Sequence, residues 1–280
     1  MRTSKLHPRV LGERLREGTR SICPGPIYRS ASHLLDSVSG SALMGRKRFS
    51  EFHSKARQPR TYTEDLEYVN LPNLRHPVFF RPGTSDVGEI IHSCIRKAYR
   101  MYLPEGEVRL IIDAGANIGD TTVWYLNKFP HATVIALEPD ADNFRVLEKN
   151  CAPYGERAVP IHVALWSNEA EKLTIRSSNV ASGISVESTD NHGGLECAGV
   201  SMPNLLKMVG ASELDIFKCD IEGAERHVFS ADSGDWLRRT RHIAIEIHSS
   251  ECENAVLSAI SQGQFEHFKY RDLNVFRRVQ

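Results

Sequence analysis

Short apolar runs that alternate with helix-like segments constrain the fold of this 280-residue chain more than any other feature. Each run is long enough for a strand and far shorter than the roughly 20 residues of a membrane helix. They cover residues 108–113, 133–138, 159–165, 214–219 and 242–247. Strands that alternate with helices build βαβ units. The sequence therefore predicts an α/β fold with a doubly wound, mostly parallel sheet.

Helices are predicted between these strands. The clearest covers residues 86–102, where Thr84, Ser85 and Asp86 offer capping oxygens and apolar residues then recur at helical spacing. Further helices are predicted over residues 121–129, 141–150, 201–209 and 255–262. The tail from residue 264 alternates between apolar and polar residues, which indicates a closing hairpin.

The beginning of the chain differs in composition from the rest. Residues 1–50 hold ten Lys and Arg but three Asp and Glu, and their apolar runs lack a sustained period. We expect residues 1–70 to form a loosely ordered basic arm, and an organelle-targeting segment is the alternative. Residues 71–280 are predicted to form one folded domain.

Charge and cysteine usage narrow the class of protein. Thirty-five basic residues balance thirty-five acidic ones, so no overall charge attracts the chain to nucleic acid. No apolar stretch is long enough for a membrane span, and the first residues lack the apolar segment of a secretory signal. The six cysteines contain no CxxC pair, which is typical of reduced thiols. We therefore expect a cytoplasmic protein with no nucleic-acid partner and no membrane span.

A glycine loop follows the first strand of the predicted sheet. Gly115 and Gly119 allow a tight turn, but the middle glycine of a dinucleotide-binding fingerprint is replaced here by Asn117. Asp113 precedes the loop, and Glu138 ends the next strand, where a carboxylate can accept bonds from both ribose hydroxyls. This loop, spacing and terminal acid favour S-adenosyl-L-methionine over a dinucleotide as the cofactor.

Three segments resemble the FkbM family of S-adenosylmethionine-dependent methyltransferases. They are IIDAGANIGDTT, VIALEPDADNFRVLEKN and LDIFKCDIEGAERHVF, and the upstream FFRPGTSD and the later IAIEIH are also similar to family segments. The resemblance covers about residues 75–260. It implies a Rossmann-like class I methyltransferase sheet of seven strands with the last antiparallel, and O-methylation of sugars or other hydroxyl-bearing metabolites.

Charged side chains follow or interrupt the fourth and fifth strands. Lys218 and Asp220 point to the same face of the sheet, and Glu246 lies in the neighbouring apolar run. Asp220 is the candidate proton acceptor and Lys218 the candidate positive charge, with Glu246 holding the lysine. A purely structural Lys218–Glu246 ion pair is equally compatible with the pattern. His248 ends the fifth strand as a candidate base or loop cap.

A scheme without a metal is favoured, although Asp220, Glu222, Glu246 and His248 could together approach a divalent cation. The polar region 176–197, next to a strand predicted at 172–176, is the expected lid over the acceptor. The leading hypothesis is a methyltransferase that acts on a hydroxyl of a saccharide or related small molecule. A dinucleotide-dependent oxidoreductase and a non-catalytic S-adenosylmethionine-binding module are the alternatives. The sequence determines neither the acceptor nor the oligomeric state.

Overall fold

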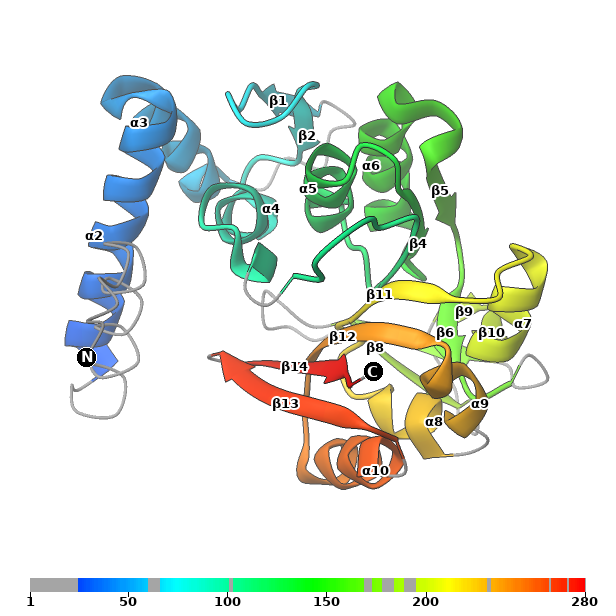
Figure 1. The fold of residues 1–280 in the computed structure, drawn as a ribbon. Helices are drawn as coiled ribbons and strands as arrows, with labels where there is room; N and C mark the ends of the chain where they lie inside the picture. The colour runs from blue at the N-terminus through cyan, green and yellow to red at the C-terminus, as the bar shows by residue number, and fades with distance from the viewer. Residues whose placement is uncertain are drawn as a thin grey trace.

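A seven-stranded sheet forms the centre of the computed structural model (Figure 1). The structure describes residues 25–59, 66–100, 103–168, 173–177, 184–188, 195–230, 233–261, 263–270 and 272–279. The strands of the sheet are β3 (Leu110–Ala114), β4 (Thr133–Leu137), β5 (Ala158–Ile161), β11 (Leu214–Cys219), β12 (Thr240–Glu246), β13 (Phe265–Tyr270) and β14 (Leu273–Arg278).

The strand order is β13-β14-β12-β11-β3-β4-β5. The five strands from β12 to β5 pair in parallel, whereas β14 pairs antiparallel with both β12 and β13. This arrangement confirms the predicted doubly wound, mostly parallel sheet with an antiparallel last strand. The direction of winding reverses between β3 and β11, and ligands of such sheets bind beyond the carboxyl ends of the strands at this reversal.

Separate apolar cores cover the two faces of the sheet. Ile111 and Ile112, adjacent in β3, belong to different cores because successive side chains of a strand point to opposite faces. One core takes side chains from α5 (Asp120–Lys128) and α6 (Ala141–Cys151). The other takes them from α7 (Met202–Met208), α8 (Glu225–Ser230), α9 (Ser233–Arg238) and α10 (Ser250–Ser261). In the described part of the chain, no helix is long and apolar enough to cross a bilayer.

The helix predicted over residues 86–102 is wrong in its second half. The described residues form α4 (Asp86–Ile90), a π-helical turn η2 (Ile91–Ile95) and a separate 3-10 turn η3 (Ala98–Arg100). The carbonyl oxygen of Cys94 accepts a bond from the Asn73 amide at 3.0 Å, and Lys97 adopts a left-handed φ of 57°. Tertiary contacts therefore end the helix that the apolar spacing favours. Residues 101 and 102 lie outside the described residues.

Helices occupy much of the region that the sequence predicts as a loose arm. They are α2 (Gly25–Met44), α3 (Arg46–Ser54) and the short η1 (Lys55–Arg57). Phe49 and Phe52 are buried in the core, and the Phe49 ring lies so close to Gly40 that a Cβ there would be 2.0 Å from it. The small residues of α2 thus admit an aromatic ring instead of forming turns. Residues 1–24 and 60–65 of the predicted arm lie outside the described residues.

Two short strands span the predicted domain boundary at residue 70. β1 (Glu67–Val69) pairs antiparallel with β2 (Val78–Phe80). The Phe80 ring meets the Phe52 ring edge-on at a centroid distance of 5.4 Å. Within the described residues, the segment before residue 70 is therefore packed onto the segment that follows it.

The run predicted as one strand over residues 159–165 is two strands in different sheets. β5 ends at Ile161, and β6 (Ala164–Trp166) pairs in parallel with β10 (Gly199–Ser201). The strand predicted at 172–176 is confirmed as β7 (Leu173–Ser177). It pairs antiparallel with β8 (Ile184–Ser188) and β9 (Leu195–Cys197). Residues 178–183 and 189–194 of the expected acceptor lid lie outside the described residues.

Asn150, buried at the end of α6, connects three parts of the fold. Its Oδ1 accepts a bond from the Phe79 N–H at 2.7 Å, and its Nδ2 donates to the carbonyls of Phe79 at 3.0 Å and Ile118 at 2.7 Å. One amide therefore joins β2 and α6 to the loop between β3 and α5.

We predict that Asn150→Leu lowers the free energy of unfolding by on the order of 3 kcal/mol, because three backbone groups lose their buried partner. Urea denaturation measures the change. Glu148→Gln, on the exposed side of the same helix, is the control and should shift stability by less than about 0.5 kcal/mol. Equal stability of the two variants would show that Asn150 does not hold these segments together.

Candidate active site

A cavity of about 880 Å³ opens beyond the carboxyl ends of β3, β4, β11 and β12. Seven of the nine site residues predicted from the sequence line it: Gly115, Asn117, Glu138, Lys218, Asp220, Glu246 and His248. Asp113 and Gly119 lie behind this lining, where they support the loop. The structure thus brings seven residues predicted for cofactor binding and for catalysis into the wall of one cavity.

The glycine loop depends on backbone conformations that most residues avoid. Gly115, Asn117 and Gly119 have φ values of 71°, 50° and 84°. A Cβ on Gly115 would lie 1.8 Å from the carbonyl oxygen of Asp220, so the loop packs directly on the turn after β11. A Cβ on Gly119 would lie 2.7 Å from the side chain of Leu147 in α6. Gly115 and Gly119 are therefore required for packing as well as for the turn.

Glu138 is fixed at the end of β4 with its carboxylate in the cavity wall. Oε2 accepts a bond from the Asn117 N–H at 2.8 Å, and Oε1 accepts one from the Asp140 N–H at 3.0 Å. Burial raises the pKa of Glu138 to about 7, against the lowering effect of these bonds. The Asn143 side chain also donates to Oε1, at a longer 3.5 Å. A carboxylate has about four acceptor positions, so Glu138 has one free position and a second held only by this long bond, which vicinal hydroxyls could use.

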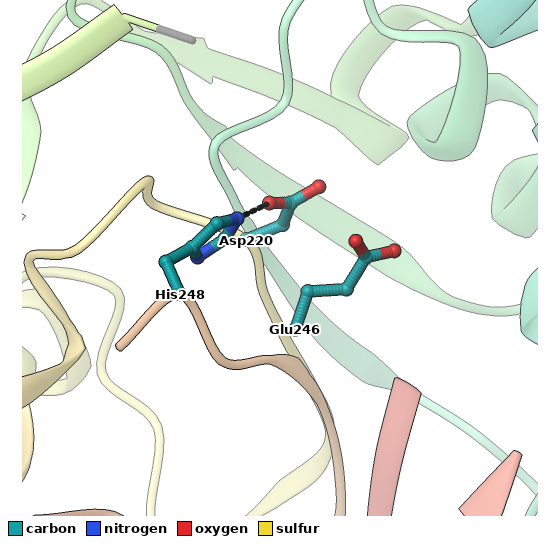
Figure 2. A group of neighbouring side chains, drawn as sticks. All are labelled: Asp220, Glu246 and His248. Atoms are coloured by element: carbon teal, nitrogen blue, oxygen red, sulfur yellow. Dashed lines mark ion pairs between the residues drawn. The ribbon is translucent and has the colours of Figure 1, made fainter. Parts of the chain in front are cut away.

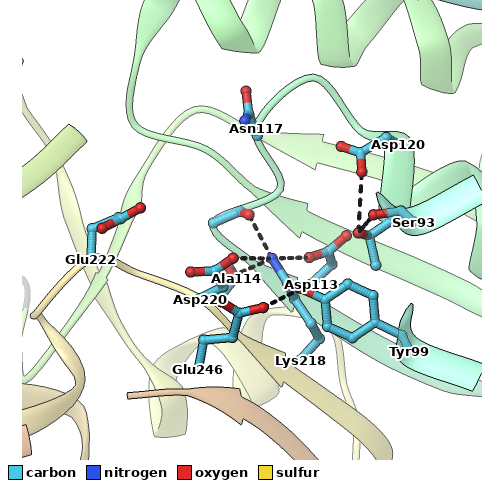
Figure 3. A network of polar contacts seen from close by, with 12 residues as sticks. Ser93, Tyr99, Asp113, Ala114, Asn117, Asp120, Lys218, Asp220, Glu222 and Glu246 are labelled. Atoms are coloured by element: carbon cyan, nitrogen blue, oxygen red, sulfur yellow. Dashed lines mark hydrogen bonds and ion pairs between the residues drawn. The ribbon is translucent and has the colours of Figure 1, made fainter. Parts of the chain in front are cut away.

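Lys218 is buried beneath the loop at the centre of a polar network (Figure 3). Its Nζ lies 3.2 Å from Asp113 Oδ1 and 3.9 Å from Asp220 Oδ2. It also donates to the carbonyl oxygens of Gly115 at 2.7 Å and Ala114 at 3.4 Å. Burial opposes the charge, but Asp113 and Asp220 raise the pKa of Lys218 above its ordinary value, so the side chain stays an ammonium.

The predicted Lys218–Glu246 ion pair is wrong. Lys218 lies opposite Asp113 on β3 and opposite Ala244 on β12, which leaves Glu246 two residues farther along its strand. Asp113 is the ion-pair partner instead, and its other oxygen accepts a bond from the Thr122 hydroxyl at 2.6 Å. Asp113 therefore holds Lys218 in place, and Lys218 in turn holds the glycine loop through the Gly115 carbonyl.

The acceptor end of the cavity gathers Asp220, Glu246 and His248 (Figure 2). His248 Nδ1 lies 2.7 Å from Oε1 of Glu225, and its Nε2 lies 3.5 Å from both Asp220 Oδ1 and Glu222 Oε2. Burial raises the pKa of Glu246 to about 7. Burial lowers the pKa of His248, but the hydrogen bond and charge of Glu225 raise it to about 9.

Three residues at this end were not predicted as site residues. Glu225 is an acidic residue at the start of a helix, where the helix dipole alone explains its presence. The structure shows that its carboxylate is hydrogen-bonded to His248. Glu89 and Tyr99 line the cavity from the segment predicted as a continuous helix. Burial raises the pKa of Glu89 to about 8, and the charge of Asp120 adds to this effect. No local pattern marks these residues, because their roles depend on pairings between distant segments.

A seven-stranded sheet with an antiparallel last strand, a glycine loop after its first strand and an acid after its second defines the class I methyltransferase fold. A family model, the Methyltransferase FkbM domain, matches residues 113–271, more than half of the chain. This chain belongs to the FkbM methyltransferase family.

Known relatives match parts of the chain. "Methyltransferase 1" from Beauveria bassiana (strain ARSEF 2860) is 29% identical over 100 residues, which are 35% of this chain and 40% of that protein. The structure of Methyltransferase FkbM from Methylobacillus flagellatus KT has 12% identity and a TM-score of 0.47. The structural match covers 83% of this chain and 59% of the chain from Methylobacillus flagellatus. The chain thus spans less than two thirds of either relative.

The corrected ion pair generates a prediction for folding. Lys218→Met leaves Asp113 charged and buried without its partner, so we expect the free energy of unfolding to fall by about 3–5 kcal/mol. Adding Asp113→Asn should restore most of this loss, because the Asn side chain still accepts the Thr122 bond. Adding Glu246→Gln instead should restore little. Chemical denaturation of the three variants compares the partners, and recovery with Glu246→Gln alone would contradict the assignment to Asp113.

Proposed function

We propose that the chain is an S-adenosyl-L-methionine-dependent methyltransferase that methylates a hydroxyl of a saccharide or related small metabolite. The observation that carries this proposal is the position of Glu138, which is locked by the backbone of the glycine loop and lines the cavity. Pockets of roughly 300–1,000 Å³ accommodate drug-sized ligands, so a cavity of about 880 Å³ fits a nucleoside cofactor with an acceptor beside it.

The residues of the cofactor end suit each part of this ligand. Glu138 would accept bonds from the two ribose hydroxyls, and the backbone at Gly115 and Asn117 leaves room for the amino-acid portion. When bound, S-adenosylmethionine supplies an electrophilic methyl group. The residues of this end would bind and orient it for transfer of that methyl group to an acceptor.

The charge of the cavity supports this cofactor over a dinucleotide. Besides Glu138, the carboxylates of Asp140, Asp142 and Asp220 line it. A pyrophosphate would meet this negative surface at a loop whose middle position is occupied by Asn117. A sulfonium and an ammonium group instead gain from nearby carboxylates.

The acceptor end suits a hydroxyl group. Carboxylates accept hydrogen bonds from hydroxyls, and Asp220 and Glu246 line the same cavity as Glu138. Because a hydroxyl has a pKa far above 7, its proton must leave as the methyl arrives. We assign this step to the cluster of Asp220, Glu246 and His248, acting together. Lys218, 3.9 Å from Asp220, keeps that carboxylate in place.

Transfer of a labelled methyl group tests the proposal. The full chain, given methyl-labelled S-adenosylmethionine and a saccharide-rich metabolite extract, should form a labelled ether product. Asp220→Asn should lower turnover by roughly a hundredfold or more, while the dissociation constant of the cofactor stays within about twofold. Binding of NAD without binding of S-adenosylmethionine would favour an oxidoreductase. Cofactor binding without transfer to any acceptor would favour a non-catalytic binding module.

Protonation of Glu138 provides a pH test of the cofactor site. Its raised pKa of about 7 means that the carboxylate is ionised above pH 7 and loses an acceptor position below it. Since ribose hydroxyls donate best to the ionised form, we expect cofactor affinity to be about tenfold lower at pH 6 than at pH 8.

Titration calorimetry of Glu138→Gln at the same two pH values is the matched control. The variant should bind weakly at pH 8 and show a much smaller ratio, because the protonation of the ligand itself is common to both proteins. An identical pH dependence in the wild type and the variant would remove Glu138 from the cofactor site.

A further inference from the structure

We propose that Asp220, Glu246 and His248 bind a divalent cation of the Mg²⁺ or Mn²⁺ kind, which holds the acceptor hydroxyl. This inference rests on the proposed function, and it departs from the metal-free scheme that the sequence favours. One possible ligand atom from each side chain lies within 4.8 Å of the other two (Figure 2). Ligands at about 2.0–2.2 Å from one ion lie at most about 4.4 Å apart, so small side-chain rotations bring all three to a cation.

The orientation of His248 is a second observation that points to a cation. Its Nδ1 is held at 2.7 Å by Glu225, a carboxylate outside the ligand set whose side chain is fully buried. A hydrogen bond of this kind fixes the ring so that Nε2 faces Asp220 and Glu222, an orientation that carboxylates give to many metal-binding histidines, and a cation would replace the Nε2 proton. We therefore regard Glu225 as a positioning residue for His248.

The distances around Nε2 leave room for an ion. Nε2 lies 3.5 Å from Asp220 Oδ1 and from Glu222 Oε2, which is beyond a normal hydrogen bond between charged groups. The imidazole thus faces two carboxylates without bonding closely to either. A cation between Nε2 and a carboxylate oxygen would replace this long contact with one bond from each group to the ion.

Lys218 neutralises only part of the local carboxylate charge. Lys218 is engaged by Asp113 at 3.2 Å and by the Gly115 carbonyl at 2.7 Å, and it is 3.9 Å from Asp220. Glu246 forms no ion pair within the described residues, and the Tyr99 hydroxyl donates to it over a long distance of 3.5 Å. A divalent ion would neutralise Glu246, with which this lysine forms no ion pair, and would share the charge of Asp220.

The ligand set indicates the kind of ion. Two carboxylates and one imidazole offer oxygen and nitrogen atoms, and thiolate is absent from the set. Such ligands suit Mg²⁺ or Mn²⁺ in a six-coordinate site, which leaves positions open for water or substrate. Because one ligand is an imidazole nitrogen, we expect Mn²⁺ to bind more tightly than Mg²⁺.

The open positions define what the cation does for methyl transfer. The acceptor hydroxyl oxygen would replace a bound water, and the ion would lower the pKa of that hydroxyl. Its O–H bond breaks with release of the proton to solvent, and the new O–CH₃ bond forms as the S–CH₃ bond breaks. The products are a methyl ether, S-adenosylhomocysteine and one proton. With the cation bound, Asp220, Glu246 and His248 therefore promote loss of the proton through the ion and do not take the proton themselves.

Mn²⁺ binding to the full chain, after removal of metals with EDTA, tests the proposal by calorimetry and electron paramagnetic resonance. We expect one site per chain. Glu246→Gln and His248→Ala should each weaken binding by more than tenfold, and Glu225→Gln by about 10–100-fold. Asp142→Asn removes an exposed acid from the far end of the same cavity and should leave Mn²⁺ affinity unchanged. Thermal unfolding of each variant checks that it folds. If His248→Ala fails to fold, the isosteric Glu246→Gln still tests the site.

The outcomes separate this inference from the proposed function. Mn²⁺ binding that depends on the three ligands supports the cation site even if S-adenosylmethionine fails to bind, in which case the function proposal fails alone. Methyl transfer that continues at full rate in EDTA, with no Mn²⁺ bound, would overturn the cation site and leave the methyltransferase proposal intact. Equal Mn²⁺ affinity in the wild type and both ligand variants would also overturn it.

Discussion

The buried ammonium of Lys218 is the interaction on which the arrangement of the cavity depends. It joins β11 to β3 at the reversal of the sheet, where it meets Asp113 and the carbonyl oxygens of Ala114 and Gly115. Burying a charge is costly even when it is paired, so this lysine contributes position more than stability. Without it, the first residues of the glycine loop would lose the group that draws their carbonyls toward β11.

Side chains in two parts of the cavity wall are positioned by this contact between Lys218 and the glycine loop. The loop packs so closely on the turn after β11 that a single Cβ at Gly115 would strike the Asp220 carbonyl. The same loop donates the Asn117 N–H that fixes Glu138 on the cofactor side. On the acceptor side, Asp220 follows β11 directly and faces His248 beyond β12. The positions of Glu138 and Asp220 are therefore coupled through a few backbone contacts.

Local patterns predict the parts of this structure that depend on short-range order. Strand period, the glycine loop and the acids at the strand ends single out nine residues, of which seven line the cavity. Partners across strands are not predicted, because they depend on register: Lys218 faces Ala244 on β12, so the expected pair with Glu246 cannot form. The helix predicted through Lys97 ends early because a distant side chain, Asn73, captures the Cys94 carbonyl. The hydrogen bond between Glu225 and His248 joins two segments, and no local sequence pattern in either predicts the contact.

The central claim is that one cavity binds the nucleoside at Glu138 and directs its sulfur toward the cluster of Asp220, Glu246 and His248. A crystal structure of the full chain with S-adenosylhomocysteine tests this most directly. The account predicts ribose hydroxyls within hydrogen-bond distance of the Glu138 carboxylate, with the sulfur facing the cluster and the glycine loop along the amino-acid portion. A nucleoside bound elsewhere, or a sulfur directed away from Asp220, would contradict it.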